Sequence, residues 1–99
     1  MSNDQYTLND VTVESAARKG NSVELAYRTT MESMFYSPGI RIEMDNDDMI
    51  VNIIRCSIDN ECDVDKKATL KEGVSHVIVD APKGGIYLGK DKSRKVDIN

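Results

Sequence analysis

Long apolar runs and tryptophan are missing from the 99-residue chain. No stretch approaches the roughly 20 consecutive apolar residues that a membrane-spanning helix needs, so no membrane is expected among its partners. The N-terminus also lacks the basic start and apolar core of a secretory signal, which predicts a cytoplasmic protein. The length fits one small domain over residues 1–99, with polar, flexible ends at about 1–8 and 90–99.

Residues suited to catalysis are scarce as well. His76 is the only histidine, and nothing in the surrounding sequence supplies the orienting partner and nucleophile that a general base requires. The chain contains no Cys-x-x-Cys, His-Glu-x-x-His or Gly-x-Ser-x-Gly sequence, and one histidine leaves a zinc site short of ligands. We therefore expect a protein that is not an enzyme, with no catalytic residue, no cofactor and no metal.

Only two cysteines are present, Cys56 and Cys62. In a cytoplasmic protein they are interpreted as reduced thiols without a function. A disulfide that closes a short loop is the alternative.

The sequence before Pro38 has the spacing of a helix over residues 22–36. Its apolar positions share one helical face, namely Val23, Tyr27, Met31 and Met34 or Phe35. Asn21 and Glu24 fit a capping box, and Pro38 ends the segment. A shorter helix is expected over 11–19. The rival interpretation is a β-hairpin, with strands over 11–13 and 23–27 and a turn at 19–21.

Alternation with period two begins after Pro38. Ile40, Ile42 and Met44 alternate with charged residues, which predicts a strand over 40–44. The Ile-rich segment 49–58 is interpreted as a central strand paired with it, although the same residues also fit one helical face. Segments 74–79 and 86–88 are expected to form a second hairpin. The predicted fold class is therefore α+β, with an N-terminal helix or helices packed on a small antiparallel sheet of about four strands.

Charge is uneven along the chain. Residues 1–65 contain 13 acidic and 5 basic side chains, whereas residues 66–99 contain 4 acidic and 8 basic ones. Within 43–65 eight carboxylates stand against Arg55 alone, and we predict that they form the partner-binding surface. These residues are Glu43, Asp45, Asp47, Asp48, Asp59, Glu61, Asp63 and Asp65. The last four alternate as in a calcium loop, but Val64 and Leu70 stand where Gly and Glu are required, so a solvated loop is expected.

These patterns predict a small acidic, non-catalytic interaction protein that binds a protein partner with a basic surface. It would act as an inhibitor or adaptor, with a viral origin as one hypothesis. One alternative is a structural assembly subunit, such as a virion or connector component, that forms a homo-oligomer. A second alternative is a small-ligand binder at an oligomer interface lined by Tyr27, Tyr36 or Tyr87. Direct binding of nucleic acid is not expected, because the net charge of the chain is −4.

Overall fold

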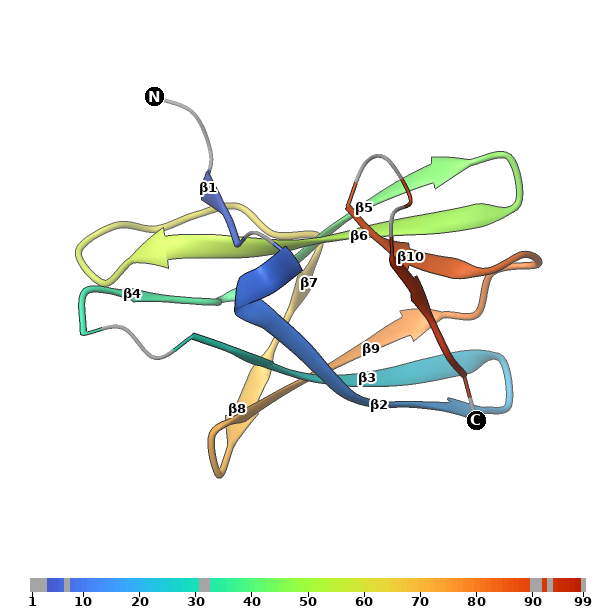
Figure 1. Ribbon diagram of the computed structural model, residues 1–99, viewed down its shortest axis with the longest axis horizontal. Helices are drawn as coiled ribbons and strands as arrows, with labels where there is room; N and C mark the ends of the chain where they lie inside the picture. The colour runs from blue at the N-terminus through green and yellow to red at the C-terminus, as the bar shows by residue number, and fades with distance from the viewer. Residues whose placement is uncertain (1–3, 7, 31–32, 90–91, 93, 99) are drawn as a thin grey trace.

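The computed structural model describes residues 4–6, 8–30, 33–89, 92 and 94–98, and these are almost entirely β-structure (Figure 1). The strands are β1 (Asp4–Gln5), β2 (Val11–Lys19), β3 (Ser22–Thr29), β4 (Phe35–Tyr36), β5 (Gly39–Asp45), β6 (Asp48–Ser57), β7 (Lys66–Lys67), β8 (Thr69–Lys71), β9 (Val74–Asp80), β10 (Ile86–Leu88) and β11 (Arg94–Val96). The described ranges contain one helical segment, the 3-10 helix η1 (Leu8–Asp10). The predicted α+β class, with its N-terminal helix or helices, is therefore wrong.

The strands form two sheets. In the larger sheet the order is β11-β10-β6-β5-β7, and β1 and β4 also pair with β6. Only the pairing of β10 with β6 is parallel among these described strands. In the smaller sheet the order is β2-β3-β9-β8, and every pairing is antiparallel.

One hydrophobic core lies between the sheets. The larger sheet contributes Ile40, Met49, Val51, Ile53, Ile86, Leu88 and Val96, and the smaller contributes Val11, Ala16, Val23, Leu25, Tyr27, Val77 and Val79. Because both sheets bury side chains in the same cluster, they pack face to face as a sandwich. No helical segment in the described ranges reaches the length and apolarity that crossing a membrane requires.

The segment predicted as the main helix is strand β3. Val23, Leu25 and Tyr27 are buried at every second position, and β2 pairs with β3 around a turn in which Gly20 has a φ of 64°. A spacing of four residues fits one face of a strand as well as one face of a helix, because four is a multiple of two. The burial of Leu25, between Val23 and Tyr27, distinguishes a strand from a helix, because only a strand places all three side chains on one face. The rival hairpin interpretation is confirmed, and Met31 lies outside the described residues.

The prediction of a central strand over 49–58 is confirmed by β6. Its register with β5 pairs Ile40 with Ile53 and Ile42 with Val51. The predicted hairpin of 74–79 with 86–88 is wrong, because β9 pairs with β3 and β8, whereas β10 joins the other sheet beside β6. In the C-terminal segment expected to be flexible, residues 94–96 form β11, and residues 90–91, 93 and 99 lie outside the described ranges.

One side of the sandwich is closed by a segment that changes sheets (Figure 1). β7 pairs with β5 in the larger sheet, and β8, two residues later, pairs with β9 in the smaller sheet. Between them, the Ala68 N–H donates to the Pro38 carbonyl at 2.9 Å. The chain therefore leaves the edge of the larger sheet at Ala68, level with Pro38.

Candidate functional site

The predicted acidic surface is divided between the two ends of β6. Asp45, Asp47 and Asp48 lie at the β5–β6 turn, where Asp45 ends β5 and Asp48 begins β6. Asp59, Glu61 and Asp63 follow the last residue of β6. The ten residues of β6 span on the order of 30 Å, so the two groups do not form one continuous patch. We name them the hairpin group and the loop group.

Two members of the hairpin group, Asp45 and Asp48, are paired within the molecule. Lys92 Nζ lies 2.9 Å from Asp45 Oδ2 and 3.1 Å from Asp48 Oδ2, and the Gly85 N–H donates to Asp48 Oδ1 at 2.9 Å. The Gly85 N–H and Lys92 lower the pKa of the Asp48 carboxyl, and the two carboxylates raise the pKa of Lys92. Asp45 and Asp48 thus fix the C-terminal segment against the turn.

Glu43 and Asp65 also serve the fold. Asn52 Nδ2 donates to Glu43 Oε1 at 3.2 Å on the outer face of the larger sheet. Asp65 Oδ2 accepts the Ile42 N–H at 2.7 Å, and the Asp65 N–H donates to the Ile40 carbonyl at 2.8 Å. Asp65 therefore extends the pairing of β7 with β5.

The carboxylates of the loop group, in contrast, are exposed and have no ion-pair partner among the described residues. Neither Glu61 nor Asp63 forms an ion pair with another described residue. The loop is fastened by a disulfide between Cys56 and Cys62, so the interpretation of the cysteines as reduced thiols is wrong and the alternative holds. Arg41 Nε adds a hydrogen bond of 3.1 Å to the Asp63 carbonyl.

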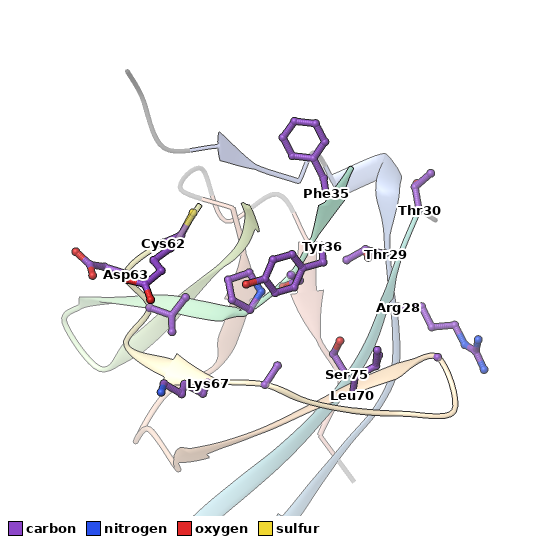
Figure 2. A pocket seen from close by; sticks show the side chains of 16 residues that line it. Arg28, Thr29, Thr30, Phe35, Tyr36, Cys62, Asp63, Lys67, Leu70 and Ser75 are labelled. Atoms are coloured by element: carbon purple, nitrogen blue, oxygen red, sulfur yellow. The ribbon is translucent and has the colours of Figure 1, made fainter. Parts of the chain in front are cut away.

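This loop forms one wall of a groove of about 870 Å³ at one end of the sandwich (Figure 2). The other walls are the end of β3, strand β4, and the β8–β9 hairpin. Tyr36 lies near the centre of the view, between the loop that carries Cys62 and the strand that carries Ser75. Tyr36 is 44% exposed and Leu70 is 72% exposed, and both line the groove. A large part of its apolar surface is thus open to solvent.

The groove coincides with a vacant position at the edge of the larger sheet. β4 pairs with β6 on one edge, and none of the described strands pairs with its other edge. The Ile58 N–H donates to the Met34 carbonyl at 3.0 Å, and hydrogen bonding alternates along an antiparallel pair. The main-chain N–H and carbonyl of Phe35 therefore point away from β6, toward the position that β7 would occupy if it continued past Lys67.

Two hydroxyl groups, one from each sheet, meet beneath the groove. Tyr27, which is 1% exposed, places its Oη 2.7 Å from Ser37 Oγ. Ser37 Oγ donates to the Gly39 carbonyl at 3.2 Å. Burial raises the pKa of the Tyr27 phenol, and the hydrogen bond to Ser37 partly offsets this effect. The floor of the groove is thus a polar link between the sheets.

The three tyrosines proposed for a ligand interface do not come together. Tyr27 is buried in the core, Tyr36 lines the groove, and Tyr87 lies on β10 with Lys92 Nζ 5.5 Å from its ring centre. Beside Tyr36, the Phe35 ring is covered by the Arg55 guanidinium, whose carbon lies 3.5 Å from the ring centre.

His76 lies away from the groove residues, on the outer face of the smaller sheet. Its Nδ1 is 3.5 Å from Glu24 Oε2, and Lys19 Nζ is 2.9 Å from Glu24 Oε1. Lys19 lowers the pKa of Glu24, and His76 does so to a smaller extent. This arrangement is a partly exposed cluster of polar side chains. Across the described ranges, no three or more His, Cys, Asp or Glu side chains are placed to hold a metal ion.

Sequence reasoning found the acidic wall of the groove but missed its apolar walls. The sequence patterns place Phe35 on a helix face and Leu70 in a charged connection, and they name Tyr36 only for a ligand site at an oligomer interface. The only available signal was the break at Pro38–Gly39, which sets Tyr36 at the end of a strand. Comparison with known proteins gave no match to a family model, a curated protein or a solved structure.

Proposed function

We propose that the chain is a small non-catalytic interaction protein that binds an extended segment of a partner protein in this groove. The observation that carries the proposal is the coincidence of the groove with the vacant sheet position beside β4. An extended peptide placed there would pair with the main chain of Phe35 and add a strand to the larger sheet. Strand addition of this kind supplies affinity through main-chain hydrogen bonds and specificity through alternate side chains.

The lining residues favour a segment that combines apolar and basic side chains. Tyr36 and Leu70 offer apolar surface, while Glu61 and Asp63 hold unpaired negative charge on the loop wall. Two cations also line the groove. Arg28 at the opposite wall is already paired, with its Nε 3.1 Å from Glu14 Oε2, and Lys67 leaves the two carboxylates of the loop wall in excess over one lysine. This pattern supports the sequence-based hypothesis of a partner with a basic surface, and it narrows the acidic surface to the loop group.

A displayed library of random peptides, selected on the purified protein, tests the proposal. We expect enrichment of peptides that alternate apolar and basic residues. Leu70→Ser should weaken their binding about tenfold, as loss of a central apolar anchor does. The matched control is Ile78→Ser, because Ile78 is 62% exposed on the same sheet but does not line the groove. Equal binding by both variants would place the peptide elsewhere and refute the proposal.

Charge reversal provides a second arm of the test. Glu61→Lys with Asp63→Lys should slow association, whereas Asp47→Lys, at the far end of β6, should have little effect. The difference should shrink as added salt shortens the Debye length from about 10 Å at 0.1 M to about 3 Å at 1 M. If selection enriches nothing, and light scattering gives an integer multiple of 11.0 kDa, the assembly-subunit hypothesis replaces this one.

If the protein is cytoplasmic, as we propose, its disulfide is unusual. Disulfides are rare in cytosolic proteins, and those that occur there mostly have catalytic or redox-sensing roles. Labelling of free thiols in protein taken from its native host tests the location, because a fully labelled pair indicates a reducing compartment.

A further inference from the structure

The acidic wall of the groove depends on one covalent bond. The main-chain N–H groups of Asp59 and Asn60 donate only to Ser57, at 3.3 Å to its Oγ and 3.0 Å to its carbonyl, so they bond the loop to its own start. The next hydrogen bonds to the sheet are made at Asp63, through Arg41, and at Asp65. Ile58 is still paired, because its N–H donates to the Met34 carbonyl at 3.0 Å. Between Ile58 and Asp63 the disulfide alone joins the loop to the sheet in the described part of the chain.

The two sulfur atoms have unequal environments. Cys56 is 1% exposed, because it lies on the outer face of β6 beneath the loop, whereas Cys62 is half-buried and lines the groove. A thiolate from solvent can therefore approach Cys62 Sγ, through the same opening that a peptide would use. Cys56 is shielded from direct attack.

We infer that this disulfide is a redox switch for the groove: the oxidised form holds the acidic wall in place and binds the partner segment, and the reduced form releases the wall. The inference rests on the proposed function. The reductant is a dithiol, either a small molecule or a protein of the thioredoxin class. Its thiolate attacks Cys62 Sγ, the S–S bond to Cys56 breaks, and Cys56 leaves as a thiolate that takes up a proton.

The second thiol of the reductant then completes the exchange. It attacks the mixed disulfide, so the reductant ends as a disulfide and Cys62 leaves as a thiol. Two electrons and two protons pass to the protein, and no other reactant is required. After reduction Cys56 keeps its place in the pairing of β4 with β6, opposite Tyr36, so the sheet beneath the loop stays paired. The change is confined to the loop that carries Glu61.

Release of the loop should weaken binding by a predictable amount. In the oxidised protein the acidic wall is ordered before the peptide arrives. In the reduced protein the same residues must be ordered on binding, and this loss of conformational freedom opposes association. We expect a dissociation constant about tenfold higher in the reduced form, which corresponds to about 1.4 kcal/mol.

Amide hydrogen exchange of the ligand-free protein tests the switch without any partner. In the protein reduced with dithiothreitol, exchange in residues 59–62 should rise at least about tenfold, while β6 and β9 keep their protection. Cys62→Ser should behave like the reduced form under oxidising conditions, because it removes the bond and leaves Cys56 in place. Asn60→Ala is the matched control, because it alters an exposed side chain of the same loop and keeps the disulfide.

The library-selected peptide then reports on binding in the same four samples. The inference is supported if the reduced protein and Cys62→Ser bind about tenfold more weakly than the oxidised protein and Asn60→Ala. Unchanged loop exchange or an unchanged dissociation constant on reduction overturns it. Failure of the proposed function looks different: the oxidised protein binds no peptide, although reduction still accelerates exchange in the loop.

Discussion

Removal of the Tyr27 hydroxyl should loosen the link between the sheets beneath the groove. In Tyr27→Phe the aromatic ring stays in the core, and only the hydroxyl that bonds Ser37 at 2.7 Å is lost. Ser37 keeps an acceptor, the Gly39 carbonyl. Loss of one hydrogen bond predicts about 0.5–1.5 kcal/mol of lost unfolding free energy.

Urea unfolding measures this change. At the usual slope of about 1–3 kcal/mol per M, the midpoint should fall by roughly 0.2–1.5 M with the slope unchanged. The melting temperature should fall by about 4–8 °C for each kcal/mol in a domain of this size. Tyr36→Phe is the matched control: Tyr36 is 44% exposed, and its loss of a hydroxyl should cost less than about 0.5 kcal/mol.

The pH dependence gives an independent check. Burial raises the pKa of Tyr27, so above about pH 10 the unfolded chain ionises this residue while the folded protein keeps it neutral. Stability due to Tyr27 is therefore complete below about pH 10 and declines as the pH rises further. The gap between the wild type and Tyr27→Phe should narrow above this pH. Equal midpoints for Tyr27→Phe and Tyr36→Phe at neutral pH would refute the reasoning.

Three further changes test the fold around the site. The pKa of Asp48 is lowered in the folded protein, so its ionised carboxyl stabilises the fold fully above about pH 4, and this stabilisation is lost as the carboxyl protonates below that pH. In urea titrations, Asp48→Asn should therefore lose less stability below about pH 4 than the wild type does. Gly84→Ala should cost about 1–3 kcal/mol in thermal melts, since an added Cβ would meet the Asp48 carboxylate and the backbone of the turn, whereas Lys83→Ala should stay within about 0.5 kcal/mol. Ile86→Ala in the core should cost about 2–5 kcal/mol, and Ile98→Ala, which is 37% exposed, should cost far less in the same assay.

The strands that could be predicted are those whose neighbours in the sheet are also neighbours in the sequence. Residues 40–44 and 49–58 form β5 and β6 because alternating or continuous Ile and Val residues meet across a short polar turn. The segment 22–36 was predicted as a helix because Val23 and Tyr27 are four residues apart, a spacing that fits one face of a helix and one face of a strand. Parallel pairing of β10 with β6 joins distant segments, and no local pattern specifies it.

The site was predictable only in part, for a related reason. Asp45 and Glu61 are 16 positions apart in the sequence, but β6 runs straight between their groups and separates them. The acidic residues are therefore close together in the sequence but divided between two places in the structure. The apolar wall was hidden because Leu70 sits among lysines and threonine in the sequence, and only the change of sheets at Ala68 places it beside Tyr36.

The uneven charge of the sequence thus serves two purposes in the structure. At the turn, Lys92 pairs with both Asp45 and Asp48, so these carboxylates contribute to folding. At the loop, Glu61 and Asp63 form no ion pair with a described residue, and they stand on a wall held by the Cys56–Cys62 bond. A salt-dependent component of partner binding should therefore arise from the loop group, and it should weaken when the disulfide is reduced.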